Sequence, residues 1–260
     1  MVTADDTTSK GSKRDARSVT AGAPDADVLV IQGEPAPSAR APLDHDRIIG
    51  TAIAFIDEFG LPPLTMRRLG SLLEVEAMAL YRHVRGREAL LDAVVDAVVE
   101  EMHHDDDTID SPRDGWQDFL QRLAHGVRRV ALLHPKVFPL VASRPPEAPW
   151  LRPPLRSLSW VESFLAGLES EGFSDAAAVA AYRSFTSFLL GHLLLEVAGN
   201  GADLGPLDVL EEGELQPDGL VDYPTVRRLR EALTEDHAAA EFEEALEDLL
   251  NRIGQIQSEL

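Results

Sequence analysis

The stretch that decides the fold is LTMRRLGSLLEVEAMALYRHV, which runs from Leu64 to Val84. Its pattern predicts two short helices, one from Thr65 to about Leu72 and one from Glu76 to His83, separated by the three residues LEV. Thr65 is a favourable N-cap for the first helix, because its hydroxyl can accept a hydrogen bond from a free backbone N–H. Two short helices joined by a tight break, with a longer helix on each side, predict a helix-turn-helix.

A longer helix is predicted before and after this stretch. The first lies within LDHDRIIGTAIAFIDEFG, has a wide apolar face, and ends at Gly60 before two prolines. The second begins at Arg87 and carries a buried stripe of Leu90, Leu91, Val94, Val95, Val98 and Met102. The short helices are expected to add to the same core the side chains Phe55, Phe59, Leu69, Leu72, Val75 and Leu80. A four-helix unit is therefore predicted over residues 42–104.

The charge of this stretch differs from that of the whole chain. The 260 residues include 45 acidic and 24 basic side chains, a net charge of −21. Between Thr65 and Arg87 there are only two acids but five arginines: Arg67, Arg68, Arg82, Arg85 and Arg87. A strongly acidic protein repels the phosphates of nucleic acid, so contact with DNA requires a small cationic surface. This stretch supplies such a surface.

The composition narrows the class of protein further. With 44% apolar residues the chain can bury a sizeable core. It has no cysteine, which excludes disulfides and thiolate zinc sites and is compatible with a reducing compartment. No secretory h-region is visible, and apolar runs such as FLLGHLLL at 188–195 fall short of the roughly 20 residues of a membrane span. A soluble cytoplasmic protein without a membrane partner is expected.

The segments on either side of the four-helix unit differ in character. Residues 1–41 lack any apolar period and are expected to be disordered; the segment is either a solubilising tail or an arm whose basic residues reach DNA. Residues 105–260 contain further amphipathic helices, including long ones at 116–134, 155–169, 175–198 and 237–260, and no period-2 strand. The chain is therefore predicted to be all-α.

Residues 44–104 resemble the N-terminal domain of the tetracycline-repressor (TetR) family of bacterial transcription regulators. The matching residues are Phe59 and Gly60, then Leu64, Thr65, Arg67 and Leu69, then Val75, then ALYRHV at 79–84 and REALLDAV at 87–94. The chain departs from the family at Glu74, where the turn usually has glycine. A left-handed turn residue other than glycine costs roughly 1 kcal/mol, so this position tests the turn geometry and not the family assignment.

The resemblance implies a set of DNA-contacting residues on the two short helices and at the start of the following one: Thr65, Arg67, Ala77, Met78, Ala79, Tyr81, Arg82, His83 and Arg87. Contacts to bases set specificity, which makes Arg67 and Met78 the candidates for sequence recognition. Thr65, Tyr81, His83 and Arg87 are expected to hold phosphates, and Arg82 is expected to lie near bases or backbone. Other interpretations stay open, since Tyr81 can close the small core, Met78 can be inert surface, and Arg87 can belong to a solvated loop.

The resemblance also implies that the protein is a homodimer. Its C-terminal half would form the contact between the two copies and enclose a small-molecule pocket. The helix at 175–198 and a seam along 237–260 both need a partner; the seam consists of Phe242, Leu246, Leu249, Ile253, Ile256 and Leu260. They either pair with their copies across a two-fold axis or bury each other within one monomer. In a dimer, two recognition helices would meet successive major grooves about 34–36 Å apart.

Aromatic and polar residues of the middle helices are the candidates for the pocket: His103, Trp116, His125, Phe138, Trp160, Phe164, Tyr182 and Phe185. His103 falls where the tetracycline repressor places a drug-contacting histidine, although HHDDD at 103–107 is equally read as a solvated helix end. Neighbouring histidines on a helix cannot face one ion, and no complete metal-ligand set or cofactor motif is visible.

These patterns together predict a ligand-responsive DNA-binding regulator, most simply a repressor, that binds a near-palindromic double-stranded operator and is released by a small molecule. The alternative is a helical adaptor protein without sequence-specific DNA binding. An enzyme is not expected, because no Gly-rich phosphate loop, catalytic triad order or HExxH motif is present.

Overall fold

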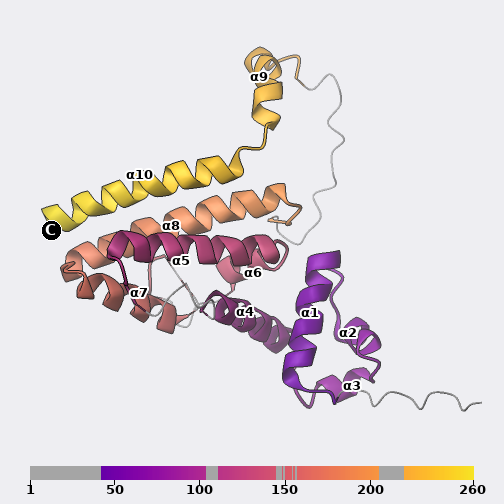
Figure 1. The fold of residues 1–260 in the computed structure, drawn as a ribbon. Coiled ribbons are helices and arrows are strands. Elements are labelled where there is room, and N and C mark those ends of the chain that lie inside the picture. Colours follow the sequence, from indigo (N-terminus) through magenta and orange to yellow (C-terminus); the bar gives the residue numbers. More distant parts are fainter. Residues whose placement is uncertain are drawn as a thin grey trace, which may run out of the picture. The chain divides into compact units, whose positions relative to one another are not determined.

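The computed structural model describes residues 42–103, 111–144, 148, 150–153, 155, 157–204 and 220–260. Regular structure in these residues is entirely helical, which confirms the predicted all-α class (Figure 1). The helices are α1 (His45–Phe59), α2 (Met66–Leu72), α3 (Ala77–Leu80), α4 (Arg87–His103), α5 (Trp116–Leu133), α6 (Phe138–Ser143), α7 (Leu158–Ser170), α8 (Asp175–Gly199), α9 (Pro224–Thr234) and α10 (Ala238–Glu259). The segment 1–41, with its two interpretations, lies outside the described residues.

The first four helices share one core. The Asp44 side chain caps α1 by accepting a hydrogen bond from Arg47 N at 2.8 Å, and Gly60 ends this helix with φ of 80°. Two residues expected in the core are instead exposed, because Phe59 is 54% and Leu72 is 53% accessible. Leu73 takes the buried place, since it lies about 40° from Leu69 around the helix, whereas Leu72 lies about 60° away on the other side.

Helix α4 connects the two halves of the chain. All six residues of its predicted stripe are buried, from Leu90 to Met102. One part of the helix packs on α1, and other parts pack on α5 and α6. A single helix therefore begins beside the helix-turn-helix and ends among the helices of the C-terminal half.

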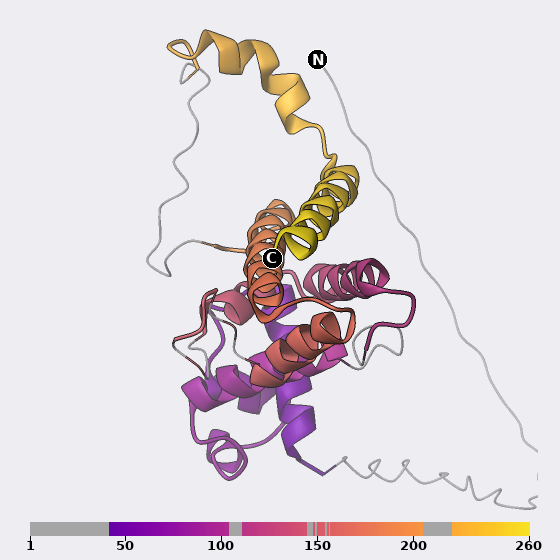
Figure 2. The same cartoon turned by 90° about the vertical axis from the view of Figure 1, so that its left-hand side faces the viewer.

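Helix α8 is the centre of the C-terminal half and contacts α5, α6, α7 and α10. By length and hydropathy it is the one helix among the described residues that is long and apolar enough to cross a membrane, which the sequence analysis did not anticipate. Nine of its residues, from Ala177 to Val197, are buried against these neighbours. Both views show α10 lying along α8 (Figure 2).

The seam of α10 is buried within its own chain. Its buried residues are Phe242, Leu246, Leu250, Ile253 and Ile256, and the helix packs on α8 and α5. Two seam residues expected from the sequence differ, since Leu249 is half-buried and Leu260 is exposed. The seam therefore needs no second copy to cover it, and a dimer would have to form through other faces.

Candidate nucleic-acid interface and ligand cavity

The helix-turn-helix depends on a close approach of α2 and α3. Thr65 Oγ1 accepts a hydrogen bond from Arg68 N at 3.2 Å, as expected of the N-cap of α2. The backbone then turns so that Val75 N donates to Gly70 O at 2.9 Å. A Cβ atom built on Gly70 would lie 2.9 Å from Val75 O, which is closer than real Cβ contacts. Glycine at this position therefore permits the crossing of the two helices.

Glu74 adopts the left-handed conformation that the family's usual glycine would adopt, with φ of 57°. It is the one non-glycine residue with positive φ among the residues that the structure describes. Left-handed backbone costs an L-residue roughly 1–2 kcal/mol, because its Cβ approaches the following carbonyl oxygen. The turn geometry expected from the sequence is kept in spite of the substitution.

Replacing Glu74 by glycine is expected to raise the free energy of unfolding by up to about 1 kcal/mol, after the greater entropy of glycine in the unfolded chain is subtracted. Operator affinity should also rise, because a carboxylate beside DNA is removed. Glu74→Gln separates the two effects, since it removes the charge but keeps the strained Cβ. Thermal unfolding and DNA titration check both effects. Unchanged or lower stability in Glu74→Gly would show that the strain at this turn is no larger than the entropy cost of glycine.

The predicted DNA-contacting residues are exposed or half-buried side chains of α2, α3 and the turn after α3, apart from Arg87 at the start of α4. Thr65, Arg67, Arg82 and His83 are exposed, Met78 is 73% and Tyr81 is 45% accessible, and Ala77 and Ala79 are half-buried. Helix α3 itself is shorter than the predicted 76–83, because Arg82 N and His83 N donate to carbonyls only three residues earlier. Leu80 and Val84 bury the inner side of this segment. The outward side therefore presents two alanines, a methionine and cationic groups together.

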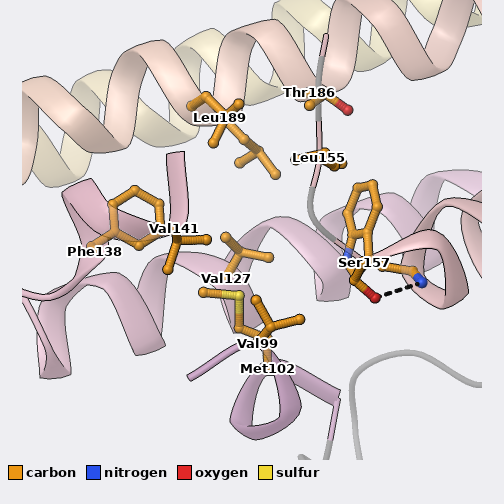
Figure 3. A pocket seen from close by; sticks show the side chains of 11 residues that line it. Val99, Met102, Val127, Phe138, Val141, Leu155, Ser157, Thr186 and Leu189 are labelled. Carbon is orange, nitrogen blue, oxygen red and sulfur yellow. Dashed lines mark hydrogen bonds between the residues drawn. The ribbon is translucent and has the colours of Figure 1, made fainter. Parts of the chain in front are cut away.

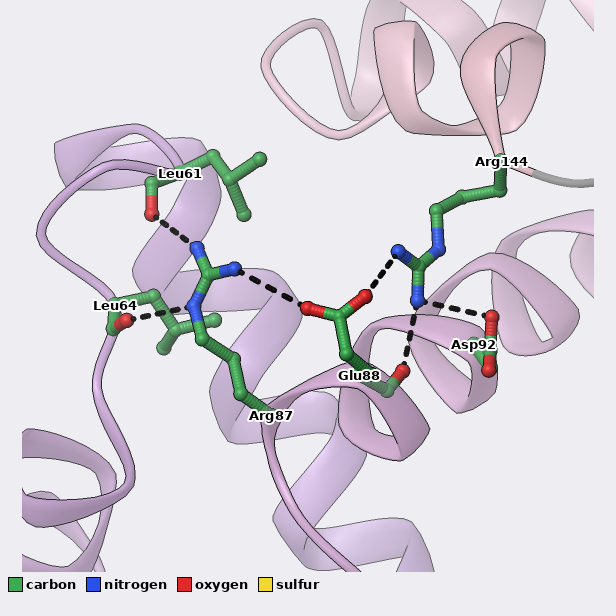
Figure 4. Close-up of polar contacts among 6 residues, drawn as sticks. All are labelled: Leu61, Leu64, Arg87, Glu88, Asp92 and Arg144. Carbon is green, nitrogen blue, oxygen red and sulfur yellow. Dashed lines mark hydrogen bonds and ion pairs between the residues drawn. The ribbon is translucent and has the colours of Figure 1, made fainter. Parts of the chain in front are cut away.

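Arg87 is directed into the protein (Figure 4). Its Nε donates to Leu64 O at 3.3 Å and its Nη2 donates to Leu61 O at 3.4 Å, while Nη1 lies 3.8 Å from Glu88. The side chain thus joins the start of α4 to the loop that precedes α2. These contacts indicate that Arg87 positions the helix-turn-helix, in addition to any phosphate contact expected for it.

A second arginine, which the sequence analysis did not single out, continues this network. Arg144 follows α6, and its Nη1 donates to Glu88 Oε2 at 2.8 Å. Its Nη2 donates to Glu88 O at 2.8 Å and to Asp92 Oδ1 at 3.0 Å. Figure 4 shows the two guanidinium groups on either side of Glu88. The first turns of α4 are therefore held both by the helix-turn-helix and by the end of α6.

His134, at the C-terminal end of α5, joins three helices. Its Nδ1 lies 2.6 Å from Asp57 Oδ2 on α1, and its Nε2 lies 3.2 Å from Glu101 Oε2 on α4. Only the imidazolium form can donate from both ring nitrogens to two carboxylates. The hydrogen bond with Asp57 outweighs partial burial and raises the pKa of His134 above its usual value. Beside it, Lys136 Nζ donates to Glu58 O at 2.9 Å.

A cavity of about 50 Å³ lies among helices α4 to α8 (Figure 3). Its wall comes from five helices and the segment before α7: Val99, Met102, Val127, Phe138, Val141, Leu155, Ser157, Trp160, Thr186, Leu189 and Leu190. Val99 and Met102 belong to the C-terminal part of α4, and Phe138 and Val141 belong to α6. The cavity therefore touches α4, which holds the helix-turn-helix through Arg87, and α6, which holds the start of α4 through Arg144.

Two of the eight pocket candidates line this cavity, namely Phe138 and Trp160. Phe164 and Phe185 are fully buried in the packing behind Trp160, and Trp116 packs on Phe173. His125 is 3.1 Å from Glu243 on the side of α10, and Tyr182 donates to Pro153 O. The backbone of His103 ends α4, and its side chain lies outside the described residues. In the described part of the chain, no group of three His, Asp or Glu residues is placed to hold a metal ion.

The cavity residues that sequence reasoning missed are mostly aliphatic. In a sequence they look like ordinary core, because they occupy buried or half-buried helix positions: Val99, Met102, Val127, Val141, Leu189 and Leu190.

A helix-turn-helix with a cationic exposed edge, joined by one long helix to a helical core with a cavity, defines a DNA-binding regulator of transcription.

The sequence is similar to known regulators of this class. The family described as "Tetracyclin repressor-like, C-terminal domain" matches residues 110–255. The tetracycline repressor protein class A from transposon 1721 of Escherichia coli is 31% identical over 207 residues, which cover 78% of this chain and 87% of that protein. The chain belongs to the tetracycline-repressor family of transcriptional regulators, which are not enzymes. The family resemblance of the sequence is thereby confirmed.

Two solved structures extend the comparison. A possible TetR family transcriptional regulator from Streptomyces coelicolor A3(2) is 30% identical, with a TM-score of 0.63, and the match covers 82% of this chain and all of that chain. The TetR family protein ActR from Streptomyces coelicolor, solved in complex with actinorhodin, is 26% identical with a TM-score of 0.58; the match covers 82% of this chain and 96% of ActR. The helix-turn-helix and helical C-terminal domain are thus those of the family.

Proposed function

We propose that this regulator is a repressor that binds a near-palindromic operator as a homodimer and leaves it when a small molecule occupies the cavity of Figure 3. Residues 42–104 form the DNA-binding domain, and residues 105–260 bind the ligand and the second copy. The observation that carries the proposal is the course of α4: Arg87 at its start holds the helix-turn-helix, and Met102 near its end lines the cavity.

On the DNA side, α3 and the turn after it enter the major groove. Arg67 and Met78 read base edges, because they are exposed on α2 and α3 and carry the donor and apolar groups that suit guanine and the thymine methyl. Thr65, Tyr81, Arg82 and His83 contact phosphates or backbone and set the register. Ala77 and Ala79 allow the helix to approach closely. Arg87 acts by holding α2 against α4.

On the ligand side, α6 provides a second connection between the cavity and the DNA-binding domain. Phe138 and Val141 of α6 line the cavity, and Arg144 at its end holds Glu88 and Asp92 of α4. A ligand that displaces α6 therefore moves the first turns of α4 relative to α1. The ligand shifts the population between DNA-competent and incompetent forms only by its difference in affinity for them.

The dimer forms through the outward faces of α8 and α10. On α8 the exposed residues Val179, Arg183, Ser187, Gly191 and Leu195 recur every four positions and make one continuous stripe. Leu195 is 75% accessible, and a Cβ on Gly191 would meet no atom within 4 Å, so the stripe is open to a second helix. Two such stripes across a two-fold axis give an isologous interface.

Selection of bound DNA from a random pool, repeated with candidate effectors, tests the proposal. A two-fold symmetric motif with half-sites about one helical turn apart is the expected result. A single, unpaired half-site would contradict the dimer, and the absence of any enriched sequence would favour the helical adaptor instead.

Replacing Arg67 by alanine is expected to relax recognition at one base position of that motif, at a cost of about 1–3 kcal/mol of discrimination. The matched control is Arg228→Ala, which removes the same charge from an exposed position on α9 outside the DNA-binding domain. Competition binding with single-base operator variants measures the effect. If Arg67→Ala keeps the full preference at every position, Arg67 does not read a base.

A further inference from the structure

The wall of the cavity is almost entirely hydrocarbon. Among the described residues, nine of the eleven side chains that line it are aliphatic, aromatic or thioether, and none of the eleven carries a formal charge. The two exceptions are the hydroxyls of Ser157 and Thr186. An ionised group placed here would lose its hydration and find no counter-charge in the wall, which is costly. The wall therefore selects against charged ligands.

The two hydroxyls differ in whether they are already engaged. Ser157 caps α7, because its Oγ accepts from Trp160 N at 3.2 Å (Figure 3). Ser157 Oγ also lies 2.8 Å from Ser159 Oγ. Thr186 is 2% accessible, and its Oγ1 is buried without a hydrogen-bond partner. Tyr182, one turn earlier, donates to Pro153 O at 2.9 Å. Its hydroxyl lies close enough to that of Thr186 for the two to interact, but Thr186 Oγ1 makes no hydrogen bond of full geometry.

We infer that the effector, if the proposed function holds, is an uncharged and largely hydrocarbon molecule that presents one hydrogen-bonding group to Thr186. A buried hydroxyl without a partner is unfavourable, so a ligand oxygen that pairs with it gains affinity and fixes the orientation of the ligand. The remaining contacts are apolar and gain affinity through buried area.

The size of the cavity determines how such a molecule acts. At about 50 Å³ it is smaller than the roughly 300–1,000 Å³ of pockets for drug-sized ligands. A larger effector has to displace part of the wall, and the unbranched side chain of Met102 on α4 is the most adaptable part of it. A ligand in the cavity therefore displaces α4 first, and this helix begins at Arg87 beside the helix-turn-helix.

Three small molecules that share a benzene ring test the inference directly: toluene, benzyl alcohol and benzoate. Each is titrated into the full chain and into the variants Thr186→Val and Thr186→Ser, and the methyl NMR signals of Val99, Met102 and Leu189 report binding at the cavity. Benzyl alcohol is expected to bind the unmodified chain, and benzoate at least about tenfold more weakly. Thr186→Val should weaken benzyl alcohol by about three- to tenfold while leaving toluene unchanged, and Thr186→Ser should restore it.

The inference is overturned if benzoate binds these methyl groups as tightly as benzyl alcohol, if Thr186→Val weakens toluene and benzyl alcohol equally, or if no molecule shifts them. The DNA selection above is independent of these titrations. A chain that enriches an operator but fails the titrations keeps the proposed function and loses the effector class. A chain that passes the titrations and enriches no operator loses the proposed function.

Discussion

Replacing Gly70 by valine is expected to abolish operator binding and to lower the free energy of unfolding by about 2–3 kcal/mol. The first side-chain atom would lie 2.9 Å from Val75 O and 3.3 Å from Ala77 Cα, and both are backbone atoms that cannot rotate away. Overpacking of this kind costs typically 1–3 kcal/mol, and here the relief has to come from separating α2 and α3. That separation moves the recognition helix away from its groove.

Gly50→Val is the matched control, because Gly50 lies on exposed α1 surface where an added Cβ meets no atom within 4 Å. Valine is the better helix former there, so the control should be at least as stable as the unmodified chain. Calorimetry and fluorescence anisotropy with the selected operator measure the two effects. Equal operator affinities for the Gly70 and Gly50 variants would mean that the crossing of α2 and α3 does not position the DNA contacts.

Replacing His134 by glutamine is expected to destabilise the protein by about 1.5–3 kcal/mol at pH 6, the usual contribution of hydrogen bonds to charged groups. Glutamine cannot supply the positive charge that faces Asp57 and Glu101. The contact joins α1 and α4 to the end of α5, so operator affinity should fall together with stability. The groups that face His134 are the carboxylates of Asp57 on α1 and Glu101 on α4, with Lys136 nearby at Glu58 O.

The sign of the pH dependence follows from the raised pKa of His134, whose first cause is the hydrogen bond with Asp57. A histidine with a raised pKa in the folded protein binds its proton more tightly there than in the unfolded chain. Its contribution is therefore complete below the unfolded value of about 6.5 and is lost as the pH rises through the folded pKa. The stability difference between the unmodified chain and His134→Gln should shrink over that interval.

His125→Gln is the control for this experiment, because His125 lies on the same helix but is half-exposed beside Glu243. The free energy of unfolding of His125→Gln should show none of the pH-dependent loss expected from the His134 contacts, because this variant keeps His134, Asp57 and Glu101. Urea titrations at intervals from pH 6 to 9 provide the comparison. A stability difference for His134→Gln that stays constant or grows with pH would refute the proposed ion pairs of His134.

Local signals explain why the DNA-binding domain was predictable from the sequence. Thr65 as a cap, Gly60 as a helix end and the left-handed turn at Glu74 are each determined by a few neighbouring residues. The error at Leu72 is a displacement of one position, to Leu73, and Phe59 lies in the last turn of α1, beyond the buried face; a helical period of 3.6 does not specify the edge of such a face. The need for glycine at position 70 was not visible, because it arises from the crossing of two helices.

The contacts that join the two halves were not predictable, because they bring together residues distant in sequence. Arg144 reaches Glu88 across 56 positions and His134 reaches Asp57 across 77. The cavity lining was equally hidden, since an aliphatic wall and an aliphatic core use the same residues. Phe138 and Trp160 were found because aromatic residues were selected as candidates, a criterion that also selected Phe164 and Phe185 from the core.

The inward direction of Arg87 bears on how the molecule moves through a genome. The guanidinium of Arg87 is occupied by the carbonyls of Leu61 and Leu64, so fewer cations remain to displace the counterions that surround a duplex. The net charge of −21 on the whole chain also opposes each encounter with DNA. Random sequence should therefore hold this protein only briefly. Such a regulator reaches its site mainly by three-dimensional diffusion and repeated dissociation, with little sliding along the double helix.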